Sequence, residues 1–290
     1  MYQPKLQPVE TAENLRQRVG RLFKEPLKLE KSNDQLSLGL SFIEKNENKV
    51  EYPSQSIGKF LDFISDAMPS GDVYLFGGVL RDLALFGRNG FNSDIDLVIE
   101  GNWSHFVTYL HSLKAQKNKF GGYRLMVGGW PVDIWNAEDT WAIKQGLVSY
   151  NGISSLTETT VLNWDAILMN WRTQQFIHKE NYFEEIKLRA LDIVLEENPN
   201  PLGMTVRVFR HLCSKEARKL TPSAAKYMAS CANLFSFEEI RGAELRSYKN
   251  NVIQPVLYRF FAEIDALENK SIEHRYSIAR NIVERELGLR

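Results

Sequence analysis

Two aspartates separated by one residue are the clearest candidates for chemistry in this sequence. Asp94 and Asp96 begin a segment, Asp94–Ile99, in which acidic and apolar residues alternate. Such alternation predicts a half-buried strand. Residues two apart on a strand face the same side, roughly 6.5–7 Å apart, so both carboxylates would point into one cleft. The pattern alone is weak evidence for a cation site, because acidic residues alternate with apolar ones on many solvent-facing strands.

A third carboxylate strengthens the case. Asp133 lies within an apolar segment, Pro131–Trp135, that also reads as a strand, and an acid there is costly unless it is paired or bound to a metal. Three carboxylates on neighbouring strands would suit Mg²⁺, and two ions about 3.5–4 Å apart could activate a hydroxyl and stabilise a leaving pyrophosphate. Asp94 and Asp96 would bridge both ions, and Asp133 would hold the one that activates the nucleophile. The alternative is a buried Asp133 capped by backbone amides.

A pair of glycines marks a second candidate site. Gly77 and Gly78 separate a predicted strand from a predicted helix, and Arg81 and Asp82 follow in the first helical turn. Without side chains, phosphate oxygens can approach the backbone N–H groups at the positive end of the helix. Arg81 could add charge-assisted hydrogen bonds, and Asp82 could orient Arg81 or lie near the metal. The alternative is a glycine pair that merely allows a tight bend.

These segments occur together in one known pattern. The run LFGGVLRDLALFG, followed by SDIDLVIEG and later by VDIW, resembles the head domain of the poly(A) polymerase and CCA-adding enzyme family. That family belongs to the DNA polymerase β-like nucleotidyltransferases, and its class II pattern is Gly-Gly-x-x-Arg-Asp followed by Asp-Ile-Asp-Leu. The resemblance implies an enzyme that uses two Mg²⁺ ions to transfer a nucleoside monophosphate from an NTP to a hydroxyl. It also implies an RNA acceptor, most naturally the 3′ end of a tRNA.

The resemblance continues more weakly beyond these motifs. The segment LNWDAI, which contains Asn163 and Asp165, looks like a later head segment of the family, and VRVFR, which contains Arg207 and Arg210, looks like its arginine-bearing helix. These four residues therefore join Gly77, Gly78, Arg81 and Asp82 as nucleotide-binding candidates.

Two departures from the family pattern bear on specificity. Residues 159–161 are Thr-Thr-Val where the family has Arg-Arg-Asp, and the acid and arginine that read the incoming base fall on Asn200 and on Gly203 or Met204. We therefore expect no ordinary CCA addition. A toxin or defence enzyme that modifies tRNA fits such a relative. The alternatives are a transferase acting on a protein or small molecule, and an inactive module that binds a nucleotide or a partner.

Composition bounds the remaining choices. The 290 residues are 43% hydrophobic and 25% charged, as in an average soluble protein, and 36 basic residues balance 36 acidic ones. Without a global positive field, an RNA substrate needs a local basic stripe, and the basic residues within 207–226 could supply one. The two cysteines lack zinc-site spacing. No secretory signal and no run of about 18 apolar residues is visible, so we expect a cytoplasmic protein.

Hydrophobic periodicity predicts three regions. We expect an N-terminal extension over 1–55, an α/β nucleotidyltransferase domain with a mixed β-sheet and helices over 56–165, and an all-α neck and body over 166–290. Strands are predicted over Asp72–Phe76, Asp94–Ile99, Tyr123–Val127 and Pro131–Trp135, the last two forming a hairpin at Gly128-Gly129. Helices are predicted over Thr11–Leu22, Ser56–Ala67, Val79–Phe86 and His105–Leu113, and from Leu162–Trp171 through to Ile272–Gly288.

Overall fold

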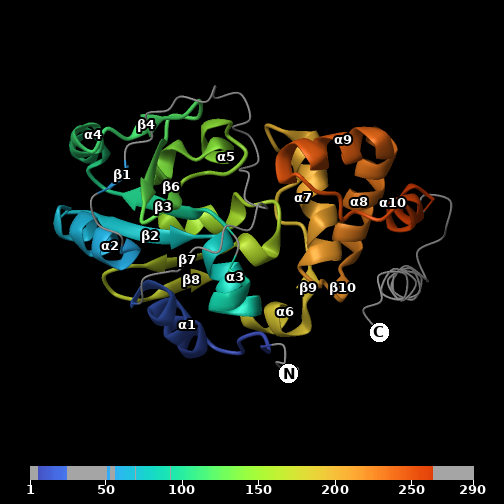
Figure 1. Ribbon diagram of the computed structural model, residues 1–290, viewed down its shortest axis with the longest axis horizontal. Helices are drawn as coiled ribbons and strands as arrows, with labels where there is room; N and C mark the ends of the chain where they lie inside the picture. Colours follow the sequence, from blue (N-terminus) through green and yellow to red (C-terminus); the bar gives the residue numbers. More distant parts are fainter. Residues whose placement is uncertain (1–5, 25–50, 53–55, 69, 92, 264–290) are drawn as a thin grey trace. The chain divides into compact units, whose positions relative to one another are not determined.

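A computed structural model describes residues 6–24, 51–52, 56–68, 70–91 and 93–263. The chain divides into two compact units (Figure 1). The sheet unit contains the described residues up to 160 together with 164–187, and the helical unit contains 161–163 and 188–263. This division differs from the expected boundary at 165, because residues 166–187 belong with the sheet.

The sheet unit is built on one mixed sheet of eight strands. Its strand order is β1-β5-β6-β3-β2-β7-β8, with β4 paired to β5. The β3–β6 and β1–β5 pairs are parallel, and the others in this sheet are antiparallel. The strands are β1 (Glu51–Tyr52), β2 (Asp72–Phe76), β3 (Ile95–Glu100), β4 (Gln116–Lys117), β5 (Tyr123–Val127), β6 (Trp130–Asn136), β7 (Ile167–Asn170) and β8 (Phe176–His178). The predicted α/β fold class is confirmed.

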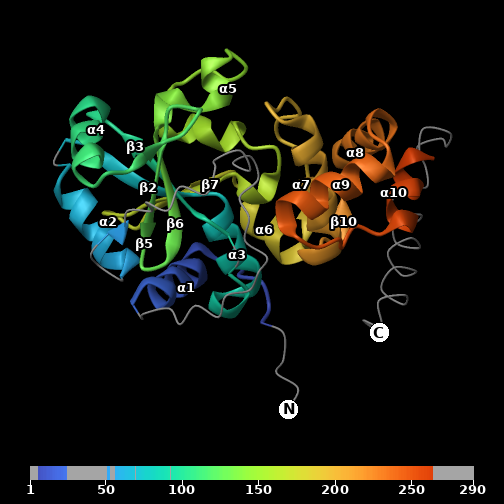
Figure 2. The same ribbon diagram turned by 45° about the horizontal axis from the view of Figure 1, so that its top comes forward.

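Amphipathic helices accompany this sheet. They are α1 (Ala12–Lys24), α2 (Ile57–Asp66), α3 (Gly78–Phe86), α4 (Trp103–Ser112), α5 (Trp141–Lys144) and α6 (Tyr182–Leu188). In α1, Leu15, Val19 and Leu22 recur at helical spacing and are fully buried. Helix α1 lies beside α3 in both Figure 1 and Figure 2. The N-terminal segment therefore contributes to the core of the sheet unit through this helix.

The β5–β6 hairpin fixes which residues face one another near the middle of the sheet. Gly128 and Gly129 have φ angles of 57° and 83°, the positive values that a two-residue hairpin turn of type I′ requires. The turn closes on the Val127 and Trp130 pair, and counting back places Arg124 opposite Asp133. The predicted hairpin is confirmed, and its register sets the candidate site.

One predicted helix is wrong. Instead of a helix over Leu162–Trp171, the chain forms a single 3₁₀ turn at Asn163–Asp165 and then strand β7. Ile167, Leu168 and Met169 are completely buried between neighbouring strands. A short, continuously apolar run of this kind has no periodicity that separates a buried strand from a buried helix.

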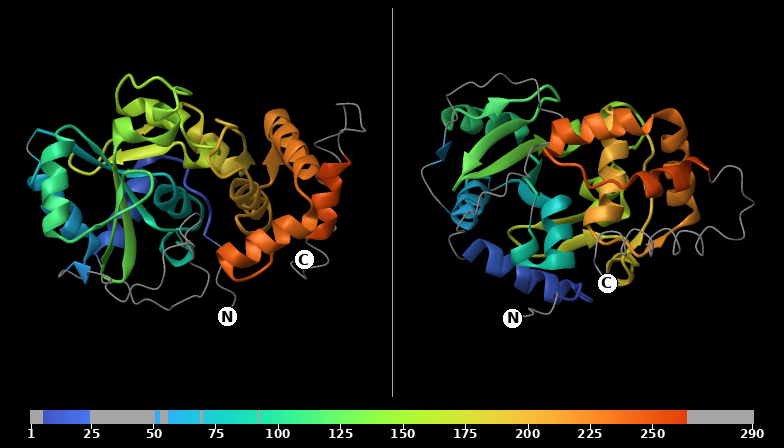
Figure 3. Two further views of the ribbon diagram at one scale, coloured as in Figure 1. Left: turned by 90° about the horizontal axis from the view of Figure 1, so that it is seen from above. Right: turned by 45° about the vertical axis from the view of Figure 1, so that its right-hand side comes forward.

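The helical unit (orange to red in Figure 3) contains α7 (Pro201–Ser214), α8 (Pro222–Leu234), α9 (Phe237–Tyr248) and α10 (Pro255–Ala262), and a parallel pair of β9 (Ala190–Leu191) and β10 (Lys219–Leu220). Phe209 packs against Tyr258 and Phe261 in its core. The helix predicted over Ile272–Gly288 lies outside the described residues. Among the helices that the structure describes, none combines the length and apolar character that a membrane span requires.

Proline and glycine begin α7 in a specific way. Asn200 is the N-cap, and its side-chain oxygen accepts a hydrogen bond from the backbone N–H of Gly203 at 3.1 Å. Pro201 occupies the first helical position, where a missing N–H costs nothing. A Cβ on Gly203 would collide with the Asn200 amide. These residues therefore form a compact helix start.

Candidate active site

Three aspartates lie on two neighbouring strands, as the sequence predicted. Asp94 immediately precedes β3, and Asp96 is its second residue. Asp96 and Asp133 are register partners across the parallel β3–β6 pair. Because alternate residues of a strand share a face, Asp94, Asp96 and Asp133 all belong to one face of the sheet. The strand geometry thus gathers the acidic side chains into a short row.

An arginine extends this acidic row. Arg124 of β5 is the register partner of Asp133, and its Nε donates to Asp133 Oδ1 at 2.7 Å. Its Nη2 donates both to Asp94 Oδ2 at 2.8 Å and to Asp133 Oδ2. Burial opposes the charged form, but hydrogen bonding to Asp133 and attraction from the three aspartates raise the pKa of Arg124 above its usual value. The guanidinium therefore stays protonated and keeps its positive charge among these carboxylates.

Asp94, Asp96 and Asp133 offer ligand atoms of the kind that Mg²⁺ prefers, but they are not arranged as a metal site in this structure. The ligand atoms would be carboxylate oxygens, and the Arg124 guanidinium already stands between two of the carboxylates as a bound cation. Within the described residues, no group of three or more His, Cys, Asp or Glu side chains is arranged closely enough to hold a metal ion. Metal binding by Asp94, Asp96 and Asp133 therefore stays a prediction.

The glycine turn lies next to the acidic row. Gly77 follows β2 with a φ of 60° and is the N-cap of α3. A Cβ on Gly78 would lie 3.2 Å from Ser93 Cβ and 3.3 Å from Ser93 Oγ. Ser93 immediately precedes Asp94, and its buried Oγ has no hydrogen-bond partner among the residues that the structure describes. A helix N-terminus, with its unpaired N–H groups, and an unsatisfied hydroxyl thus border the carboxylates.

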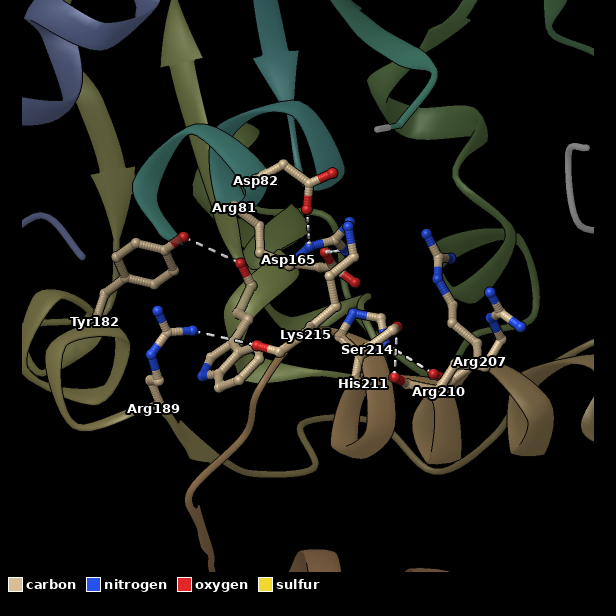
Figure 4. Close-up of polar contacts among 11 residues, drawn as sticks. Arg81, Asp82, Asp165, Tyr182, Arg189, Arg207, Arg210, His211, Ser214 and Lys215 are labelled. Carbon is tan, nitrogen blue, oxygen red and sulfur yellow. Dashed lines mark hydrogen bonds and ion pairs between the residues drawn. The ribbon is translucent and has the colours of Figure 1, made fainter. Parts of the chain in front are cut away.

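Arg81 and Asp82 lie in α3, the helix that this turn begins, and Figure 4 shows Arg81 beside Asp82 and Asp165. Arg81 Nε donates to Asp82 Oδ1 at 2.9 Å, and its Nη1 pairs with Asp165. The Arg81 side chain is 3% exposed and Asp82 is completely buried. Despite burial, attraction from Asp165 and Asp82 raises the pKa of Arg81 above its usual value. The contacts observed are ion pairs, and the expected contact of Arg81 with nucleotide phosphates stays a prediction.

The remaining candidates are held by local contacts within the helical unit. Asn163 donates through Nδ2 to the Ala190 carbonyl at 3.1 Å and accepts from the Asp192 N–H at 2.9 Å. Both functional ends of its amide therefore bind backbone. Its expected role in nucleotide binding remains a prediction.

Two arginines of α7 differ in their surroundings. Arg210 Nη1 donates to Glu244 Oε1 at 2.6 Å and to Asn250 Oδ1 at 2.9 Å, and its guanidinium lies 3.9 Å from the Tyr248 ring centroid. Arg207 is partly exposed, and its carbonyl accepts from His211 Nδ1 at 2.7 Å. Arg210 thus ties α7 to α9, whereas the Arg207 side chain reaches the surface of the helical unit.

Sequence reasoning missed Arg124 and Ser93. Arg124 is the single charged residue in the strand YRLMV, and counting through the glycine turn would have placed it opposite Asp133. Ser93 could have been noticed from its position directly before Asp94. Its closeness to Gly78 depends on the β2–β3 pairing, which the sequence does not specify.

Comparisons with known proteins support the fold. The chain is similar to a Thermotoga maritima CCA-adding enzyme complexed with tRNA, at 19% identity and a TM-score of 0.51, over 79% of this chain and 58% of that one. A CCA-adding enzyme in complex with CTP is 16% identical over 80% of this chain and 66% of that one, with a TM-score of 0.48. No protein-family model and no curated protein matches the sequence. The chain thus spans little more than half the length of the Thermotoga enzyme, and the likeness establishes a mixed sheet with a following helical region.

Proposed function

We propose that this protein is a Mg²⁺-dependent nucleotidyltransferase that transfers a nucleoside monophosphate from an NTP to an acceptor hydroxyl and releases pyrophosphate. The observation that carries the proposal is the pairing of Asp96 with Asp133 across β3 and β6, with Asp94 beside them. This acidic row borders the Gly77-Gly78 helix start, which suits a phosphate group. Carboxylates beside a phosphate seat are what phosphoryl transfer with metal ions requires.

Each group has a part in the proposed reaction. Asp94, Asp96 and Asp133 would hold the metal, which on binding would lower the pKa of the acceptor hydroxyl and neutralise charge on the phosphates. The first N–H groups of α3 and the Ser93 hydroxyl would donate to triphosphate oxygens. The ion pair between Arg81 and Asp165 would keep the glycine turn in place. Asp165 lies against Gly77, since a Cβ built on Gly77 would come within 3.5 Å of the Asp165 carbonyl oxygen.

The acceptor that we propose is an RNA 3′ end, and a tRNA is the natural first choice. The Thermotoga enzyme of similar fold was seen with tRNA. We do not expect the CCA sequence as product, because Asn200 caps α7 and Gly203 has no side chain. These two positions offer no acid and arginine pair that could imitate a base edge.

The experiment is label transfer with a matched pair of variants. Purified protein is incubated with Mg²⁺, total RNA and each of four α-labelled NTPs, and the products are sequenced. Asp96→Asn should reduce incorporation to background, because the amide keeps the shape and loses the metal-binding charge. Asp72→Asn, the same change at the far end of the sheet, should leave it intact. Incorporation by Asp96→Asn equal to wild type would refute the site, and a clean three-nucleotide CCA product would refute the expected specificity.

A second candidate function is a nucleotide-binding module without transferase activity. The observation in its favour is the Arg124 guanidinium, which pairs with two of the three carboxylates. Such a module would bind an NTP in equilibrium dialysis while transferring no label to RNA, protein or small molecules from an extract. Label on a protein or a small molecule instead would keep the transferase and change its acceptor.

A further inference from the structure

Arg124 pairs with two of the three aspartates of the candidate site, and the proposed reaction assigns it no part. It lies in the middle of β5, whose alternate residues Tyr123, Leu125 and Val127 are buried on the opposite face. A row therefore runs across three strands, from Arg124 to Asp133 and on to Asp96. The hairpin register and the parallel β3–β6 pair fix this row, so the backbone itself places Arg124 beside the carboxylates.

The contacts of Arg124 use the atoms that a metal would need. One nitrogen, Nη2, donates to an oxygen of Asp94 and to an oxygen of Asp133, and Nε takes the second oxygen of Asp133. A guanidinium does not lose its proton in proteins, so it cannot make way by becoming neutral. A cation that enters between Asp94 and Asp133 must displace it.

We propose that Arg124 is a resident counter-ion of the acidic row, and that it and a divalent cation exclude one another from Asp94 and Asp133. Metal binding then requires the guanidinium to rotate away. Phosphate oxygens bind a guanidinium through two parallel hydrogen bonds, so an arriving NTP offers Arg124 a new partner. The metal alone should therefore bind weakly, and metal and nucleotide should bind cooperatively.

The local charge and exposure agree with such an exchange. Three carboxylates and one guanidinium leave a formal charge of −2 on the row, which still attracts a divalent cation. The Arg124 side chain is 22% exposed, and Asp94 and Asp133 are 20% and 17% exposed. The arginine therefore has solvent into which its charged end can turn, as long side chains with buried stems commonly do.

The test is direct Mn²⁺ binding, measured by electron paramagnetic resonance on the purified full chain without nucleotide. Arg124→Gln should bind Mn²⁺ about tenfold tighter or more, because displacing a charge-assisted pair no longer opposes binding. Lys117→Gln is the matched control, since it removes an exposed positive charge from the adjacent strand β4. Its affinity should stay within about twofold of wild type, because exposed charges are well screened.

Arg124→Lys is a second variant that keeps the proposal testable if Arg124→Gln does not fold. It keeps the positive charge but replaces the two-pronged guanidinium with a single ammonium, so its Mn²⁺ affinity should lie between those of wild type and Arg124→Gln. Addition of a non-hydrolysable NTP analogue should tighten Mn²⁺ binding in wild type more than in Arg124→Gln. Unchanged or weaker Mn²⁺ binding in both arginine variants would overturn the inference, as would Mn²⁺ binding by neither variant.

The counter-ion proposal rests on the proposed function, because both take the same aspartates as metal ligands. The experiments nevertheless distinguish a failure of one proposal from a failure of the other. Tighter Mn²⁺ binding by Arg124→Gln without any label transfer by wild type would support the counter-ion and remove the transferase. Label transfer that depends on Asp96, combined with equal Mn²⁺ binding by wild type and Arg124→Gln, would support the transferase and remove the counter-ion.

Discussion

Replacing Arg81 by methionine should lower the free energy of unfolding of the sheet unit. We expect this loss of stability to be the main effect of the substitution, ahead of any effect on nucleotide binding. Arg81 is 3% exposed and pairs with Asp82, which is completely buried, and with Asp165. Methionine has a similar length and no charge, so Arg81→Met leaves both carboxylates in the interior without the guanidinium. Removing one partner of a buried ion pair costs about 3–5 kcal/mol, because the charge left behind is poorly solvated. We expect a loss of that size in the free energy of unfolding.

The assay can be confined to the sheet unit. All six tryptophans of the sequence fall within the residues of that unit, so tryptophan fluorescence during urea denaturation reports its unfolding and not that of the helical unit. Adding Asp165→Asn to Arg81→Met should recover part of the loss, since it removes one of the two stranded charges. Arg81→Lys should lose less than Arg81→Met, because an ammonium retains the charge.

A loss below about 1 kcal/mol in Arg81→Met, within the range of ordinary exposed pairs, would refute this reasoning. The Arg81 side chain would then be free to leave its carboxylates, and the expected role on nucleotide phosphates would gain support. In that case the Michaelis constant for the NTP should rise in Arg81→Met while the urea midpoint stays near that of wild type.

Three further outcomes are expected. Gly203→Ala should lower the stability of the helical unit by about 0.5–2 kcal/mol in far-ultraviolet circular dichroism melts, because a Cβ there displaces the Asn200 cap; an unchanged melt would contradict this. Ser93→Ala should leave stability unchanged, since its Oγ has no partner within the described part of the chain, yet raise the Michaelis constant for the NTP; an unaltered constant would remove Ser93 from the phosphate site. Burial, followed by the nearby acids, raises the pKa of Tyr74 to about 12 from 10.0. Its contribution to stability is complete below pH 10 and declines as the pH rises toward 12, so Tyr74→Phe should flatten the alkaline fall in tryptophan-detected stability, and an identical slope would contradict the assignment.

The sequence predicted the elements around the site well because their signals are local. The β5–β6 hairpin follows from two glycines with positive φ between apolar strands. The strand positions of Asp94, Asp96 and Asp133 follow from alternation and from an acid in an apolar strand. These signals need only residues within a few positions along the chain, whereas the β3–β6 pairing that joins the three aspartates into a row links distant segments.

The parts that the sequence did not predict depend on pairing between distant segments. The sequence predicts a helix where strand β7 forms, because the burial of this strand comes from β2 and β8 on either side. One partner of Arg81 is Asp165, which lies 84 residues away. The sequence predicts Arg81 in the nucleotide site from the glycine turn and Asp165 from the family resemblance, but their pairing with one another became visible only through the fold.

The two arginines near the candidate site differ in one property that decides what each can do. Both pair with carboxylates on the sheet unit, and attraction from those carboxylates raises the pKa of each above its usual value, against burial. Arg81 is 3% exposed, so its charged end has no solvent to enter and leaving Asp82 would strand a charge in the interior. Arg124 is 22% exposed, and its departure would leave carboxylates that a divalent cation can neutralise in its place. We therefore expect Arg124 to exchange partners more readily than Arg81, which is the behaviour that the proposed counter-ion role requires of Arg124.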